Sequence, residues 1–396
     1  MRGSLVEAAR AKRELIRLFI ERIRRGERPA TNVRLYDLPP RGGGGRGIPH
    51  AAEDGGSRVE DFEAYTLYIA RGWAASYEAA GGGYRVSFEA EYSDVGIVLP
   101  QAYSEERVRL YRETLEALAA LEVLPRIGGG LLLWDGSLRP LVAKHRPGAS
   151  EAGMAEAARI LRDRLRLDLE EALGELEKLW AQGEAPASPG LIASRLEVEA
   201  LGDRDYVWVA LLEWAEKLLA VKRLLESAWR AGVTPLFITK TSRSTSLFGG
   251  ILPDVYYLKR LRRFDPFRTE HRILRGLEEF RGVEKGSLRG PLLPVEAGLD
   301  EFYRERLGLA ELYVRLDAGA PILKVEVAFD AGQADPGRLE GLVERSVEAL
   351  QGLPRARGYP LGLSVAHRRA RLAGGDVERI LAVLGLELER SGRWML

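Results

Sequence analysis

Residues 131–140 read LLLWDGSLRP and carry the clearest signal of the fold. The four apolar residues predict a buried strand that runs directly into Asp135. A buried strand holds its last residue rigidly, and the glycine that follows lets the chain turn. The pattern therefore predicts a carboxylate at the end of a strand, where open α/β sheets gather ligands. An ordinary aspartate that caps its own turn fits the same pattern.

Strand-like and helix-like segments alternate on both sides of this stretch. Residues 104–122 predict a helix before it, and residues 336–352 and 375–385 predict helices near the C-terminus. Runs rich in Val, Ile, Tyr and Phe predict strands, the last two as a hairpin, at 65–77, 84–92, 94–100, 234–240, 312–316 and 322–329. The predicted fold class is α/β, with a mixed sheet flanked by helices.

Three further segments shape the domain organisation. Residues 4–25 predict an amphipathic helix that packs on the domain, and residues 39–49 predict a glycine-rich loop. Residues 151–230 contain few strand formers and predict a long helical insertion or interface arm. The expected divisions are an N-terminal helix, the first half of the α/β domain, the helical insertion and the second half of the domain, at 1–30, 31–150, 151–230 and 231–396.

Composition excludes several classes of protein. The chain has no cysteine, which excludes disulfides, thiol nucleophiles and Cys-ligated zinc. Its 59 basic and 58 acidic residues nearly cancel, so net charge gives no argument for nucleic acid, although one face can still be basic. No apolar run reaches the ~18 residues of a membrane span, and the N-terminus lacks the apolar core of a signal peptide. A cytoplasmic protein, with a composition that fits a thermophile, is therefore expected.

A second aspartate stands in a related setting. Asp54 precedes Gly55, Gly56 and Ser57, and the pattern places it in a turn just ahead of a long strand. Two such segments predict carboxylates that converge from different strands. Mg²⁺ and Mn²⁺ prefer oxygen ligands of this kind, and two aspartates repel one another unless a cation lies between them. Asp54 and Asp135 are therefore candidate metal ligands.

The C-terminal segment RGYPLGLSVAHRRARL contributes Tyr359 and His367. A histidine followed by several arginines could contact a phosphate, ligate a metal or transfer a proton. A histidine on a solvated basic helix fits equally well, and His145 is a competing candidate.

The segment FITKTSRS predicts a strand that delivers Lys240, followed by a basic, hydroxyl-rich run with Arg243. Such side chains beside a strand end can hold phosphate oxygens, although an exposed polar loop would also fit. The order of a P-loop is absent, as are the G-x-S-x-G and H-E-x-x-H motifs.

Taken in their order along the chain, the segments around Asp54, Asp135, Lys240 and Tyr359–His367 resemble the NurA nuclease family over residues 50–371. The resemblance implies an RNase H-like or PIWI-like nuclease fold with a helical insertion. It also implies a divalent-metal-dependent deoxyribonuclease that uses Mn²⁺ or Mg²⁺ as a 5′-3′ exonuclease and single-strand endonuclease. The implied partners are single-stranded DNA, the ends of double-stranded DNA, a HerA-type hexameric ATPase and a second copy of the chain, in DNA end resection.

The resemblance also implies roles for individual residues. Asp54 and Asp135 match the two catalytic aspartates of the family, and Tyr359 and His367 match its C-terminal pair. His367 would complete the metal shell or assist proton transfer, and Tyr359 could stack on a base or hydrogen-bond the DNA backbone.

The helix before Asp135 should carry a catalytic glutamate, for which Glu113 and Glu116 both qualify, with a slight preference for Glu113. Lys240 resembles the family's lysine after the strand, and Lys240 and Arg243 would hold phosphates. Together these residues predict metal-assisted phosphodiester hydrolysis.

Two alternatives remain at this stage. The chain could be a catalytically inactive scaffold that binds DNA or a translocase. It could also be an RNase H-like nuclease that acts on RNA or hybrids, since recognition of the 2′-OH rests on few contacts.

Overall fold

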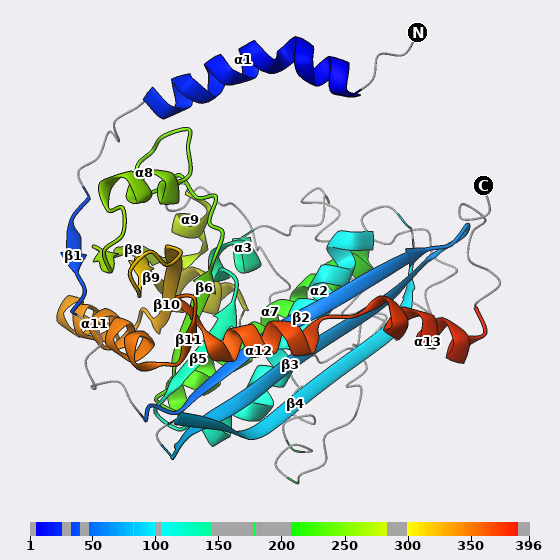
Figure 1. Ribbon diagram of the computed structural model, residues 1–396. Helices are drawn as coiled ribbons and strands as arrows, with labels where there is room; N and C mark the ends of the chain where they lie inside the picture. Colours follow the sequence, from blue (N-terminus) through cyan, green and yellow to red (C-terminus); the bar gives the residue numbers. More distant parts are fainter. Residues whose placement is uncertain are drawn as a thin grey trace.

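The computed structural model describes residues 5–25, 33–39, 47–81, 83–99, 104–143, 207–282 and 299–386, together with residues 101, 178 and 182 (Figure 1). Ten strands of these ranges form one mixed sheet. The strands are β1 (Leu35–Asp37), β2 (His50–Asp61), β3 (Thr66–Ala80), β4 (Gly83–Val98), β5 (Leu131–Asp135), β6 (Thr234–Thr239), β7 (Phe267–Thr269), β8 (Arg272–Arg275), β9 (Leu307–Arg315) and β10 (Leu323–Asp330). A separate two-stranded hairpin joins β11 (Arg355–Ala356) and β12 (Tyr359–Pro360).

Helices cover both faces of the sheet. They are α1 (Leu5–Arg25), α2 (Ser104–Val123), α3 (Leu138–Ala143), α7 (Val207–Arg230), α8 (Asp254–Leu261), α9 (Gly276–Arg281), α10 (Leu299–Glu301), α11 (Pro336–Gly352), α12 (Leu361–Ala370) and α13 (Gly374–Leu384). A 3-10 turn at Leu124–Arg126 and a π-helical turn at Phe302–Arg306 complete the set. One buried apolar cluster contains α2 and α7, and a second contains α11 and α12. Figure 1 shows α12 crossing β2 and β3 on the side opposite α2 and α7.

The strand order and register bring Asp54 of β2 and the end of β5 side by side in the sheet. The order is β1-β7-β9-β10-β6-β5-β2-β3-β4, with β8 beside β9. Strands β2, β5 and β6 are parallel, whereas β3 and β4 continue from β2 as an antiparallel meander. Glu53 pairs with Trp134, so the next residues, Asp54 and Asp135, lie side by side on neighbouring strands.

Asp54 lies inside a strand, and the prediction of a turn at this position was wrong. Strand β2 runs on to Asp61, well past Gly55 and Gly56. The two glycines instead allow helices to approach the strand closely. A Cβ on Gly55 would lie 2.1 Å from Oε1 of Glu116 in α2, and a Cβ on Gly56 would lie 2.2 Å from the carbonyl oxygen of Ala370 in α12. Both helices therefore pack directly on β2, on opposite faces.

Gly72 in β3 also lets α2 approach the sheet closely, and this contact predicts an effect on stability. A Cβ at this position would lie 2.2 Å from the backbone carbon of Leu115, and a helix backbone cannot yield as a side chain can. Gly72→Ala is therefore expected to lower the free energy of unfolding by at least about 2 kcal/mol, as measured by urea denaturation. Gly128→Ala is the matched control, because nothing lies within 4 Å of a Cβ there. Equal stability of the two variants would contradict this packing.

Most of the sequence-predicted elements are confirmed. The predicted helices at 104–122, 336–352 and 375–385, the strands at 131–134 and 234–240, and the C-terminal hairpin all agree with α2, α11, α13, β5, β6 and the β9–β10 pair. The predicted strands at 84–92 and 94–100 are in fact one continuous strand, β4.

Two predictions about helices need correction. The final part of the 151–230 segment is α7, a core helix: Trp214 and Lys217 are fully buried, and α7 packs on α2. Residues 151–206, apart from 178 and 182, lie outside the described residues, as does most of the 39–49 loop. Helix α1 stands away from the sheet with apolar side chains such as Phe19 exposed, so its predicted packing on the domain was wrong for most of its length (Figure 1). Its last turn does contact the domain, where the hydroxyl of Tyr256 in α8 donates to the backbone oxygen of Ile23. Within the described ranges, no helix combines the length and the apolar character needed to cross a bilayer.

Candidate metal centre

Three side chains from distant parts of the chain converge beside the end of β5. Asp54 of β2, Asp135 of β5 and His367 of α12 each offer one ligand atom, and these atoms lie within 4.8 Å of one another. Nδ1 of His367 lies 2.7 Å from Oδ2 of Asp54. The structure therefore brings together the three residues that the sequence nominated as metal ligands.

The local architecture explains the convergence. Strand β5 ends at Asp135, whereas β2 continues, so Asp54 is left beside an open strand end. Helix α12 reaches β2 because Gly56 lets its backbone approach, and this contact delivers His367. The side chains of Asp54 and His367 are 13% and 63% exposed, so the cluster is open to solvent on the α12 side.

The donor set fits a divalent cation. Burial raises the pKa of Asp135, and the charge of Asp54 raises it further, while Lys240 opposes the shift. Two carboxylates at this separation repel each other until a cation neutralises them. Two carboxylates and one imidazole form a donor set that suits Mn²⁺ and related ions, whereas soft metals prefer sulfur ligands. Asp54, Asp135 and His367 are the residues that would hold such an ion.

A buried carboxylate that the sequence did not reveal lies directly behind the three. Glu53 is 0% exposed, and its Oε1 accepts a hydrogen bond of 3.2 Å from the backbone N–H of Asp135. Its Oε2 is buried and has no hydrogen-bond partner among the described residues. Burial, and then the charges of Glu116, Asp54 and Asp135, raise the pKa of Glu53 well above its ordinary value. The available signal in the sequence was its position next to Asp54.

Of the two candidate glutamates on α2, Glu116 faces the metal centre. Burial raises the pKa of Glu116 to about 8, and the charges of Glu113, Asp54 and Asp135 contribute to this rise. Arg112 opposes it, with Nε 3.1 Å from Oε1 of Glu116.

Glu113 points elsewhere on the same helix. Its Oε2 lies 3.7 Å from Nζ of the buried Lys217, and Arg109 and Arg112 flank it. The geometry therefore reverses the sequence-based preference for Glu113 over Glu116.

Lys240 and Tyr359 form the rim of the centre. Nζ of Lys240 lies 3.8 Å from Oδ2 of Asp135 and 3.6 Å from the centroid of the Tyr359 ring, which is a cation–π contact. Tyr359 is 4% exposed, so the proposed stacking of a base on its ring does not fit the structure. Burial, and then Asp135, raise the pKa of Tyr359, so its hydroxyl stays protonated and can donate.

Arg243 does not belong to this cluster. Arg243 is exposed and lines a separate cavity beyond Thr239 and Thr241. His145, the histidine that competed with His367, lies outside the described residues.

The chain is similar to known proteins in both sequence and structure. The chain is 24% identical over 306 residues to the DNA double-strand break repair nuclease NurA of Saccharolobus solfataricus, covering 77% of this chain and 72% of that protein. The crystal structure of the NurA nuclease from Sulfolobus solfataricus matches with a TM-score of 0.64 and 20% identity, over 100% of this chain and 99% of that one. A crystal structure of NurA bound to dAMP and manganese matches with a TM-score of 0.56 and 17% identity, over 96% and 97% of the two chains. The NurA domain family model matches residues 50–372, and the chain therefore belongs to the NurA family.

Proposed function

We propose that this protein is a divalent-metal-dependent DNA nuclease. The observation that carries the proposal is the convergence of Asp54, Asp135 and His367, with the buried Glu53 and Glu116 behind them. The relatives support it, since one is named a DNA double-strand break repair nuclease and another was crystallised with dAMP and manganese. Mn²⁺ is accordingly the proposed cofactor, with Mg²⁺ as its substitute.

We assign different roles in phosphodiester hydrolysis to the side chains of the site. Asp54, Asp135 and His367 would hold the cation, which when bound lowers the pKa of water and neutralises charge on the phosphate. Lys240, beside Asp135, is placed to donate to a non-bridging phosphate oxygen. Glu53 fixes the backbone of Asp135 by accepting its N–H.

Two further groups complete the proposed mechanism. Glu116 would offer a third carboxyl group to the centre, and because its pKa is raised to about 8 in the metal-free protein it can exchange a proton near neutral pH. The buried hydroxyl of Tyr359 has no hydrogen-bond partner among the described residues, and it would donate to Asp135 or to a phosphate oxygen.

We further propose that the fold is RNase H-like. The supporting feature is the half of the sheet that surrounds the metal centre. Strands β4, β3 and β2 form an antiparallel meander, and β5 and β6 follow on the other side of β2, both parallel to it. Helix α2, which carries Glu116, connects the meander to β5. A carboxylate on β2, one at the end of β5 and one on the connecting helix then meet at one place.

Membership of the NurA family supports the finer assignments. They are 5′-3′ exonuclease and single-strand endonuclease activities on DNA ends in the cytoplasm. The proposed partners are a HerA-type hexameric ATPase and a second copy of the chain.

The direct test is a cleavage assay on end-labelled single-stranded and double-stranded DNA, with Mn²⁺, Mg²⁺ or EDTA. We expect cleavage of DNA only when the metal is present. RNA and RNA–DNA hybrid substrates form a parallel arm, and preferential cleavage of either would favour the RNase H-like alternative. Binding to DNA without any metal-dependent product would favour the inactive scaffold.

A further inference from the structure

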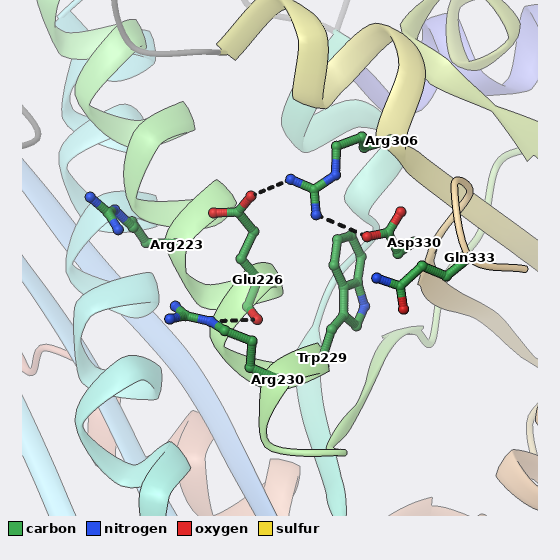
Figure 2. A pocket seen from close by; sticks show the side chains of 7 residues that line it. All are labelled: Arg223, Glu226, Trp229, Arg230, Arg306, Asp330 and Gln333. Carbon is green, nitrogen blue, oxygen red and sulfur yellow. Dashed lines mark hydrogen bonds and ion pairs between the residues drawn. The ribbon is translucent and has the colours of Figure 1, made fainter.

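Three cavities among the described residues differ in the charges that line them. One lies at the C-terminal end of α7, where Arg306 bridges Glu226 and Asp330 at 2.7 and 2.9 Å, so two carboxylates stand among its arginines (Figure 2). A second, between β2 and α2, includes Glu105 and Glu106 among its lining residues. The third cavity is lined by no carboxylate at all.

This acid-free cavity lies among α3, α9, β10 and the loop after β6. Its volume is about 610 Å³, which is within the range of small-ligand pockets. Four cationic side chains line it, from four separate segments of the chain: Arg139, Arg243, Arg281 and Lys324. Five hydroxyl side chains are interspersed among them, from Ser137 to Ser244. The lining therefore combines positive charge with hydrogen-bond donors.

The buried charges behind the lining neutralise one of the four cations, Lys324. Lys324 is neutralised from below by Glu311 at 2.6 Å and Glu326 at 2.8 Å, both of which are buried. Within the described part of the chain, the guanidinium groups of Arg139 and Arg243 have no carboxylate partner, although the backbone N–H of Arg139 donates to Glu326. Nε of Arg139 donates to the backbone oxygen of Phe280, and this bond fixes its guanidinium at the wall between α3 and α9. An anion is the ligand that this arrangement favours.

The cavity begins where the metal centre ends. Ser137 in the lining is two residues after Asp135, and Thr239 and Thr241 flank Lys240. Lys240 itself faces Asp135, so the ends of β5 and β6 carry metal-centre and cavity residues in immediate succession. Alternate residues of a strand point to opposite faces, so the cavity, on the α7 side, and the metal centre, on the α12 side, meet at the shared ends of β5 and β6. A DNA strand that passes around these strand ends could contact both.

We propose that this cavity is a second phosphate-binding subsite, which takes the phosphate of a nucleotide next to the scissile bond of a single DNA strand. The planar guanidinium groups can each bond two phosphate oxygens, and hydroxyls such as those of Thr239 and Thr241 can donate to the others. This inference rests on the proposed function in that the bound strand is the substrate. It adds Arg139 and Arg281, which come from segments other than the FITKTSRS loop.

The test measures binding without cleavage. The intact protein and the variants Arg243→Glu and Arg281→Glu are titrated in EDTA against a fluorescent single-stranded oligonucleotide that carries a 5′-phosphate or a 5′-hydroxyl. Each variant is expected to weaken binding at least about 10-fold and to reduce the salt slope by about one. Arg345→Glu, an exposed arginine on α11, is the matched control and should bind within about twofold of the wild type. Arg243→Gln, with an unchanged melting temperature, guards against misfolding of the charge-reversed variants.

The outcomes separate the two proposals. Equal losses with both oligonucleotides would assign the cavity to an internal phosphate, and a loss confined to the 5′-phosphorylated one would assign it to a terminal phosphate. Wild-type affinity in both Arg243→Glu and Arg281→Glu would overturn the subsite. Failure of the nuclease proposal would look different, because the wild-type protein would then leave DNA uncut in Mn²⁺ whatever these variants bind.

Discussion

Asp135→Asn and Asp54→Asn are each expected to lower Mn²⁺-dependent cleavage of single-stranded DNA by a factor on the order of 1000. Each change removes one carboxylate charge and replaces an anionic oxygen ligand with a weakly coordinating amide. The amide has the same shape, so β2 and β5 should pair as before and the melting temperature of the metal-free protein should not fall. Initial rates with excess Mn²⁺ give the comparison.

Asp335→Asn is the matched control for these two variants. Asp335 caps α11, where its side chain accepts a hydrogen bond from the backbone N–H of Arg338, and asparagine caps a helix about as well. This variant should keep the wild-type rate. Full activity in both Asp54→Asn and Asp135→Asn would contradict the assignment of the metal ligands.

Glu116→Gln is expected to lower the cleavage rate about 100-fold, whereas Glu113→Gln should leave the rate per folded molecule within severalfold of the wild type. The reason is orientation: the charge of Glu116 acts on Asp54 and Asp135, and Glu113 faces the buried Lys217. Glu113→Gln should instead lower the melting temperature, because Lys217 then lacks its charge partner. Equal rates in the two variants, or a larger loss in Glu113→Gln, would contradict the orientation of α2.

The pKa of Glu116 also fixes a pH dependence. The pKa rises from 4.5 in the unfolded chain to about 8 in the metal-free folded protein, so the folded state binds more protons between these values. Stability of the metal-free protein is therefore fully present below about pH 4.5 and is lost as the pH rises through 8, by at most about 5 kcal/mol from this group. Glu116→Gln removes this titration, so its melting temperature should fall less steeply between pH 5 and 8.5. A steeper fall than in the wild type would contradict the raised pKa.

Much of the fold could be predicted because each core strand has its own local signal. The run LLLW followed by Asp135 is apolar enough to be buried wherever it lies, and it forms the central strand β5. Strand β2 could not be predicted in the same way. Its sequence, HAAEDGGSRVED, has two glycines and several charges, which locally favour a turn. Only the close approach of α2 and α12 from opposite faces explains why a strand needs glycine there, and that approach is a tertiary fact.

The metal ligands could be predicted from the sequence, whereas the buried carboxylates behind them, Glu53 and Glu116, could not be assigned. Asp54, Asp135 and His367 stood out by their residue types and neighbours, whereas Glu53 belongs to a class that is almost never fully buried. Glu113 and Glu116 are three residues apart and both buried on α2, so helical periodicity places them near one another. What separates them is which residue meets β2 and which meets α7, and this depends on the packing of three elements that are distant in sequence.

The most direct measurement of the central claim is a titration of the metal-free protein with Mn²⁺, in which electron paramagnetic resonance counts the free ion. If Asp54, Asp135 and His367 hold the cation, the wild-type protein binds Mn²⁺ saturably, and Asp54→Asn, Asp135→Asn and His367→Ala each weaken binding at least about 10-fold. Asp335→Asn binds as the wild type does. Superimposable binding curves for the wild-type protein and all three ligand variants would contradict the claim.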